Sequence, residues 1–256
     1  MKNKSSILLI CVGILIMGIG LYGLWDILTE YHEADEKHEV LEQEYVEKLE
    51  LPELQKKLEL KEIEWYELAM VDVGALKAKY PNVVGWIFYE NEKISYPIMQ
   101  ADNKIYMTTS YDGSYSSSGS IFMNATDSSD FTDMHTIIYG HNMKNLGMFG
   151  RLKFYYRKEN YFQNHKYFQI FTEDEILRFE VFCYQEVPTG SDVYTRKWES
   201  ATELGNYLMS KAMESSGKVI AEDDQIITLS TCTGSDEYRF IVNAVLVDRY
   251  PIEGEE

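Results

Sequence analysis

Residues 226–232 read Ile226-Ile227-Thr228-Leu229-Ser230-Thr231-Cys232, and a second apolar run, Arg239-Phe240-Ile241-Val242, follows after Thr233-Gly234-Ser235-Asp236-Glu237-Tyr238. The first run is rich in β-branched residues, which favour strands, and the segment between the runs is typical of a turn. The sequence therefore predicts a β-hairpin. We expect Cys232 and Arg239 to face each other across it.

This placement makes Cys232 a candidate nucleophile. A guanidinium close to a thiol favours the thiolate, which is the form that acts in covalent catalysis. The alternative interpretation is a small buried apolar side chain, which is the commoner role of an unpaired cysteine.

His141 is the candidate proton carrier. It follows a second branched run, Thr136-Ile137-Ile138-Tyr139-Gly140, and opens a polar loop. A histidine and a cysteine that each follow a strand can meet at one end of a sheet. The alternative for His141 is a side chain that only satisfies its loop. The other four histidines are weaker candidates for the proton carrier. His32 and His38 lie in a highly charged segment, and His135 and His165 are flanked by polar residues.

Several motifs together resemble one known family. The run ending at Cys232, with Arg239-Phe240-Ile241-Val242, resembles the active-site signature of sortases. Tyr139-Gly140-His141-Asn142-Met143, followed by Met148-Phe149-Gly150, resembles the histidine loop of the class B branch. Three earlier matches, Val83-Val84-Gly85-Trp86-Ile87, Ile94-Ser95-Tyr96-Pro97-Ile98 and Gly119-Ser120-Ile121-Phe122, extend the resemblance over roughly residues 72 to 248. Separate motifs in the family's order are more specific than any single one.

The resemblance implies a cysteine transpeptidase. Cys232 would attack the carbonyl after the threonine of a C-terminal sorting motif on a secreted protein, and the thioester would pass to an amine of a peptidoglycan precursor. His141 would protonate the leaving amine, and Arg239 would stabilise the oxyanion or position the substrate. The residues expected to line the substrate groove are Tyr139, Ser230 and Thr231.

The sequence is also compatible with other functions. A thiol peptidase would hydrolyse wall or surface peptides with the same residues, a pilin-polymerising sortase would join proteins to one another, and a membrane-tethered binding protein would need no chemistry. The loop between Cys232 and Arg239 is short for the class. Whether Asp236 or Glu237 assists is also open, because turns favour acidic residues in any case.

An uncharged apolar segment at residues 7–25 predicts a membrane anchor. It is long enough to cross a bilayer as a helix, and Lys2 and Lys4 before it favour a cytoplasmic N-terminus. We expect a single-pass protein of the cell membrane with an extracellular catalytic domain. A cleaved signal peptide is the alternative, but it usually has a shorter apolar core and a small-residue cleavage site.

We expect three parts: a cytoplasmic tip and anchor (1–25), a helical stalk with N-terminal helices (26–71) and a catalytic domain (72–256). Apolar residues at helical spacing predict a helix in the stalk, which Pro52 interrupts. The same kind of spacing predicts a second helix over 61–79. The stalk could hold the domain away from the membrane, pack back on it or pair with another chain.

The catalytic region predicts a mainly β fold. Eight short strand-like segments lie at 83–89, 94–99, 119–123, 136–139, 167–172, 176–187, 225–231 and 239–247. Short strands with turn-like connections favour a closed, sortase-like β-barrel of eight strands. A helix is expected over 199–215, between strands 6 and 7. In class B sortases such a helix walls the substrate groove, although covering the barrel would explain the same apolar stripe.

The amino-acid composition limits the classes of partner and cofactor that we expect. The 256-residue chain has a formal net charge of −18 and no basic stripe, which argues against nucleic acid as a partner. We interpret the many charges of residues 26–64 as a solvated helical face. The three cysteines, Cys11, Cys183 and Cys232, lie in separate segments, so no disulfide framework is predicted. The acidic residues are dispersed, and we expect no metal site and no cofactor.

Overall fold

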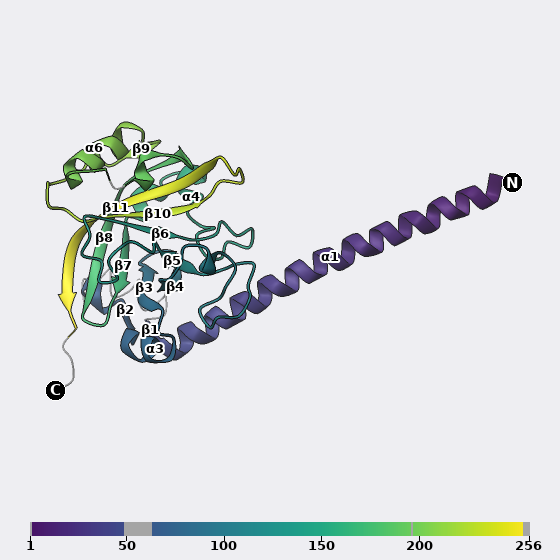
Figure 1. Ribbon diagram of the computed structural model, residues 1–256, viewed down its shortest axis with the longest axis horizontal. Coiled ribbons are helices and arrows are strands. Elements are labelled where there is room, and N and C mark those ends of the chain that lie inside the picture. Colours follow the sequence, from purple (N-terminus) through teal and green to yellow (C-terminus); the bar gives the residue numbers. More distant parts are fainter. Residues whose placement is uncertain (1, 49–62, 196, 253–256) are drawn as a thin grey trace.

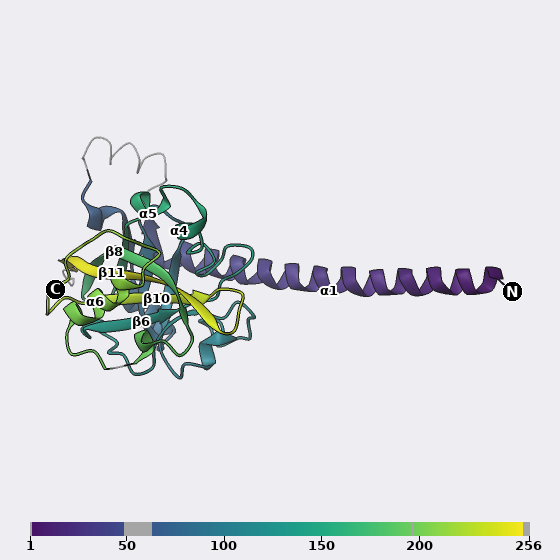
Figure 2. The same cartoon turned by 90° about the horizontal axis from the view of Figure 1, so that it is seen from above.

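A long helix and a β-barrel make up the molecule (Figure 1). The computed structural model describes residues 2–48, 63–195 and 197–252. Helix α1 (Lys2–Tyr45) projects from one side of the barrel, and the described chain ends on the other side (Figures 1 and 2). The stalk interruption expected at Pro52 lies outside the described residues.

Eight strands close into the barrel, as the sequence predicts. Around the barrel their order is β11-β10-β6-β5-β4-β3-β7-β8, and β11 closes the ring by pairing with β8. Neighbouring strands are antiparallel except the pairs β4–β5 and β6–β10, which are parallel. The strands are β3 (Val83–Tyr89), β4 (Ser95–Met99), β5 (Ile121–Met123), β6 (His135–Tyr139), β7 (Tyr167–Phe171), β8 (Glu175–Pro188), β10 (Ile226–Cys232) and β11 (Tyr238–Pro251).

Long strands β8 and β11 make closure possible. Each has 14 residues, so β11 pairs with β10 near its start and with β8 along its whole length. Irregular register at Asn243/Ala244 and at Leu246/Asp248 bends the strand where it follows the barrel wall. Apolar side chains such as Ile87, Phe168 and Leu229 fill the core, and their removal from water is the main stabilising contribution.

The predicted helix between strands 6 and 7 is present as α6 (Ala201–Ser210), between β8 and β10. The hydroxyl of Ser200 caps it by accepting a hydrogen bond from the backbone amide of Glu203. Residues expected to extend the helix instead form β9 (Glu214–Ser215), which pairs with β8. In Figure 1, α6 and β9 lie across the barrel from β1 (Val46–Lys48).

The helix expected over 61–79 is wrong in its first half. A 3-10 turn, η1 (Trp65–Glu67), and a strand, β2 (Ala69–Val71), precede helix α3 (Val73–Lys79). The strand forms because β2 pairs antiparallel with β1. The side chain of Asp72 then caps α3, so the helix starts late in the apolar pattern.

The stalk packs back on the barrel, which was one of the three expected alternatives. Leu41 and Val46 are buried in a cluster that includes Trp86 of β3. By contrast, apolar side chains from Ile10 to Leu28 are exposed. This part of α1 is long and apolar enough to cross a membrane, so α1 is a candidate membrane anchor.

Candidate active site

Strands β6 and β10 bring His141 and Cys232 to the same end of the barrel. The two strands are parallel neighbours, and Tyr139 aligns with Ser230. Beyond this pair, the Gly140 amide donates to the Ser230 carbonyl at 3.1 Å. Asn142 Nδ2 donates to the carbonyl of Cys232 at 2.8 Å. Residue 141 lies between these two bonds, so its backbone is attached to the strand that carries the thiol.

The hairpin places Arg239 directly opposite Cys232 in the β10–β11 register. Both residues are half-buried, whereas Cys183 on β8 is fully buried. The Arg239 guanidinium donates through Nη1 to the carbonyls of Ser235, Asp236 and Tyr238 at 3.5, 3.3 and 2.9 Å. The arginine side chain is therefore held by its own hairpin.

One cavity of about 250 Å³ unites the residues selected from the sequence. Its lining includes His141, Cys232 and Arg239, and also Tyr139, Ser230 and Thr231. Asp236 and Glu237 lie exposed on the hairpin and do not line this cavity.

The imidazole of His141 is oriented by the cavity wall. Its Nε2 donates to the carbonyl oxygen of Met107 at 2.7 Å, rather than bonding to Cys232. The backbone carbonyl of His141 accepts from the amide of Phe149 at 3.0 Å, which ties the end of its loop to its start. Both the ring and the main chain of this histidine thus have defined contacts.

An aromatic wall flanks the thiol. The Tyr139 ring stacks on Phe122 and on Tyr194, with centroid distances of 5.2 and 6.4 Å. The Tyr194 hydroxyl lies 2.9 Å from the hydroxyl of buried Ser230. Burial raises the pKa of Tyr194 to about 12, so its phenol stays protonated near neutral pH.

The hydroxyl of Thr231, unlike that of Ser230, is not hydrogen-bonded to another described residue. The Thr231 side chain is only 3% exposed, and its Oγ1 has no hydrogen-bond partner within the described ranges. A buried hydroxyl without a partner is costly, and this one belongs to a residue that lines the cavity. It is a group that a bound molecule could satisfy.

Sequence reasoning did not select Asn103, Met107 and Phe122, which also line the cavity, or Asn142 and Tyr194, which contact lining residues. Asn142 stands beside His141 in a motif that was already singled out, so its position was an available signal. Tyr194 belongs to a 3-10 turn, η3 (Asp192–Tyr194), far from the other residues in sequence, and no pattern marks it. Met107 contributes only a backbone carbonyl to His141, which any residue could supply.

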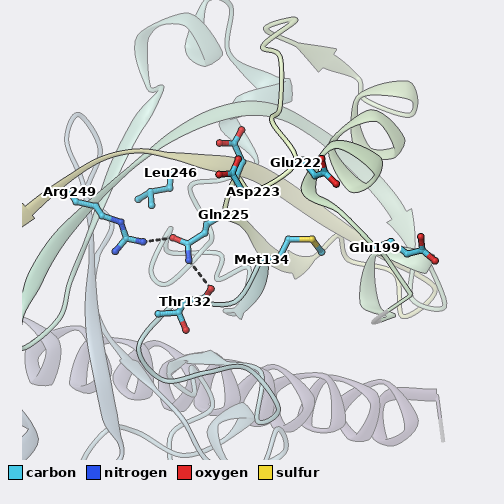
Figure 3. A pocket seen from close by; sticks show the side chains of 9 residues that line it. Thr132, Met134, Glu199, Glu222, Asp223, Gln225, Leu246 and Arg249 are labelled. Carbon is cyan, nitrogen blue, oxygen red and sulfur yellow. Dashed lines mark hydrogen bonds between the residues drawn. The ribbon is translucent and has the colours of Figure 1, made fainter.

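A larger cavity, of about 560 Å³, lies at the other end of β10 (Figure 3). Four of its nine lining residues are acidic, and Gln225 and Arg249, which also line it, are hydrogen-bonded to each other. No group of three or more His, Cys, Asp or Glu side chains suited to a metal ion occurs in the part of the chain that the structure describes. The acidic residues that line this larger cavity are Glu199, Glu222, Asp223 and Asp224.

Comparison with known proteins identifies the family. The model of the Sortase domain matches residues 90–247. The chain belongs to the sortase family. Sortase B of Listeria monocytogenes is 33% identical to this sortase over 177 residues, which are 66% of this chain and 71% of the relative.

Solved structures agree with the class B branch. Sortase B from Bacillus anthracis, in complex with AAEK1, matches with a TM-score of 0.70 and 27% identity, covering 86% of this chain and 99% of that one. A class B sortase of Streptococcus pyogenes involved in pilus biogenesis matches with a TM-score of 0.62 and 28% identity, covering 68% and 97% of the two chains. This protein is thus a class B sortase, a cysteine transpeptidase of the family that anchors surface proteins.

Proposed function

We propose that this sortase cleaves a C-terminal sorting motif of secreted proteins after threonine and joins the new carboxyl end to a peptidoglycan amine. The Cys232 thiolate attacks the threonine carbonyl, the peptide C–N bond breaks, and a thioester forms. The acceptor amine then attacks the thioester, and the thiolate leaves. The supporting observation is the single cavity that His141, Cys232 and Arg239 line together.

His141 serves both steps as the proton carrier. It donates a proton to the departing amine and later takes one from the incoming amine. To do so, the imidazole exchanges its bond with the Met107 carbonyl for a bond to the substrate nitrogen. Since the Gly140 amide and the Asn142 side chain, on either side of His141, are both bonded to β10, the exchange needs only rotation of the His141 side chain.

Arg239 stabilises the oxyanion of the tetrahedral intermediate. A guanidinium has five N–H donors, and all its hydrogen bonds to the described residues start from Nη1. The Nε and Nη2 donors are therefore available to the substrate carbonyl. Its attachment to the hairpin carbonyls limits reorganisation as charge develops.

Tyr139, Ser230 and Thr231 bind the sorting peptide. The stacked ring of Tyr139 provides an apolar surface. The unpartnered hydroxyl of Thr231 is suited to a peptide amide or to the threonine hydroxyl. Ser230 acts indirectly: its hydroxyl is hydrogen-bonded to the Tyr194 hydroxyl and so holds the Tyr194 ring beside Tyr139.

The exposed apolar part of α1 supports the proposed location. We place residues 1–25 in the cytoplasmic tip and membrane anchor, 26–71 in the stalk, and the catalytic domain, 72–256, outside the cell. The partners are then secreted proteins with a sorting motif and a peptidoglycan precursor at the membrane surface. The net charge of −18 is consistent with the absence of nucleic acid among them.

Mass spectrometry tests the reaction. The purified full chain in detergent is incubated with a library of candidate pentapeptides, and the intact protein is then digested. We expect an acyl adduct on the peptide that contains Cys232, with a mass that ends at threonine. A Cys232→Ala protein that still cleaves the same peptide at the wild-type rate would refute the assignment.

The acceptor separates the remaining functions. Addition of an oligoglycine amine yields a joined product from a wall-anchoring transpeptidase and only the free acid from a thiol peptidase. A pilin-polymerising enzyme, which the similarity to the Streptococcus pyogenes protein involved in pilus biogenesis makes the second candidate, would prefer an amine on a folded protein. We expect the small amine to be accepted.

A further inference from the structure

The loop that begins at His141 has a strained backbone. Leu146 and Met148 have φ values of 72° and 51°, in the left-handed region that non-glycine residues rarely adopt. Such conformations persist only where the surroundings impose them. The contacts that hold this loop therefore also determine where His141 lies.

Two side chains outside the loop contact it close to these strained positions. The hydroxyl of Tyr96, on β4, accepts a hydrogen bond from the Met148 amide at 3.1 Å. The carboxylate of Asp35, on α1, accepts one from Asn145 Nδ2 at 2.9 Å. Met148 in turn pairs with Asn142, the residue after His141, in an isolated β-bridge.

Both contacts lead back to α1. Asp35 belongs to it directly. His38, one turn later, packs edge to face against the Tyr96 ring with a centroid distance of 5.2 Å. Burial lowers the pKa of His38 to about 4, so the ring packs as a neutral aromatic group near neutral pH. The end of α1 beside the barrel thus supports the histidine loop at two points.

We propose that the membrane-proximal helix is a positioning element of the active site: Asp35 directly, and His38 through Tyr96, hold the loop that orients His141. The inference rests on the proposed function of His141 and deepens it. The anchor helix then has a second role, because it supports the loop that carries the proton carrier as well as attaching the enzyme to the membrane.

The test uses alkylation of Cys232 by iodoacetamide in the full chain in detergent. The rate is measured at pH values from about 5 to 9, where thiols and imidazoles titrate, and the site is located by peptide mass spectrometry. The variants are Asp35→Ala and Tyr96→Phe. Each removes the acceptor of one hydrogen bond to the loop and leaves the residues that line the active-site cavity unchanged.

Matched controls separate positioning from general helix packing. Tyr111→Phe removes a hydroxyl that donates to the Lys37 carbonyl on α1 at 3.2 Å, so it weakens packing of the same helix without contacting the loop. Glu33→Ala removes an exposed acid of α1. Asp35→Asn keeps a side-chain carbonyl that can accept from Asn145, and we expect it to behave more like the wild type than Asp35→Ala does.

We expect Asp35→Ala and Tyr96→Phe to shift the alkylation profile toward that of His141→Ala, with rate changes of about 3- to 10-fold, the size expected for one hydrogen bond. The controls should stay at the wild-type profile. If His141→Ala itself leaves the profile unchanged, the proposed function fails. If His141→Ala changes it while Asp35→Ala and Tyr96→Phe match Tyr111→Phe, only the inference fails. Should Tyr96→Phe not fold, Asp35→Ala against Asp35→Asn decides.

Discussion

The two ends of the β6–β10 pair have similar components and different chemistry. One end carries His141, Arg239 and the smaller cavity, and the other carries His135, Arg249 and the larger one. The seven residues of β10 separate them by about 20 Å at 3.3 Å per residue. Cavity size therefore does not identify the active site. Only the smaller cavity contains a half-buried thiol next to an imidazole and a guanidinium.

The two histidines show the same contrast. His135 is 4% exposed, and its Nε2 donates to the Thr228 hydroxyl, which donates in turn to Asn243. This buried chain fixes the ring in the barrel wall. His141 instead bonds to a single main-chain carbonyl at the edge of a cavity, so its ring can change partners during a reaction.

The largest difference should appear between two cysteines. Cys232→Ala should lower peptide transfer by at least about 10³-fold, because the nucleophile is lost. Cys183→Ala should leave the transfer rate within about 2-fold and lower the free energy of unfolding, since it creates a small cavity in the core and removes the sulfur that accepts from Asn243. Transfer kinetics and urea unfolding measure both effects. Equal losses of activity in the two variants would contradict the assignment of the nucleophile.

The histidine pair gives the next largest effect. His141→Ala should lower the turnover rate by about 10² to 10⁴-fold, as expected for loss of general acid and base catalysis. His135→Gln should change the free energy of unfolding. The turnover rate of the molecules that fold should stay within about 2-fold of the wild-type rate. The comparison requires the turnover rate per folded active site, obtained by titrating Cys232 with iodoacetamide. A large turnover defect in folded His135→Gln would show that the two ends are coupled.

Acid should destabilise the protein through the buried histidine. Burial lowers the pKa of His135 from the ordinary 6.5 to about 4. Between these values the unfolded chain binds a proton that the folded chain does not. The stabilisation is complete above pH 6.5 and falls as the pH drops to 4, by up to about 3 kcal/mol. His38 acts in the same direction.

Urea unfolding of the full chain at several pH values measures this effect. The control is His135→Gln, which cannot titrate at this position and should therefore show a shallower loss of stability in acid. An unchanged dependence in this variant would mean that His135 is not responsible.

Much of the fold could be predicted from the sequence because the strands are short, branched and separated by turns. Each of the eight expected segments overlaps a barrel strand, and α6 lies where an amphipathic stripe indicated a helix. The error at 61–79 has a physical cause: burial of Leu68, Ala69 and Leu76 fits a helix, but pairing with β1 converts part of the segment to a strand.

The active-site residues could be predicted from the sequence only in part, for a different reason. His141 and Cys232 follow strands, so one local pattern marks both. Tyr194 contacts the cavity residue Ser230 from a turn that lies 36 residues earlier in the chain, and only the closed barrel brings the two together. His135 was expected among polar loop residues, yet it begins β6 and is buried, because its neighbour strand β10 supplies a polar partner.

The two arginines provide a smaller contrast. Arg239→Lys should lower turnover by about 10-fold, since an ammonium keeps the charge but loses the planar set of donors for the oxyanion. Arg249→Lys should leave turnover within about 2-fold, because Arg249 bonds to Glu175 and Gln225 at the far end. Steady-state kinetics with a cleavable sorting peptide measures both. If Arg239→Lys raised only KM, the arginine would position the substrate rather than stabilise charge.

The smallest effect should come from the acidic cavity itself. Neutralising Glu222 and Asp223 together, as Glu222→Gln and Asp223→Asn, should leave turnover within about 2-fold, because about 20 Å exceeds the Debye length of about 8 Å at physiological salt. Removing like charges should also raise the melting temperature slightly. Kinetics at low and at physiological salt make the comparison. A loss of turnover that is present at both salt concentrations would mean that the larger cavity binds part of the substrate, and the two ends of the barrel would then form one extended site.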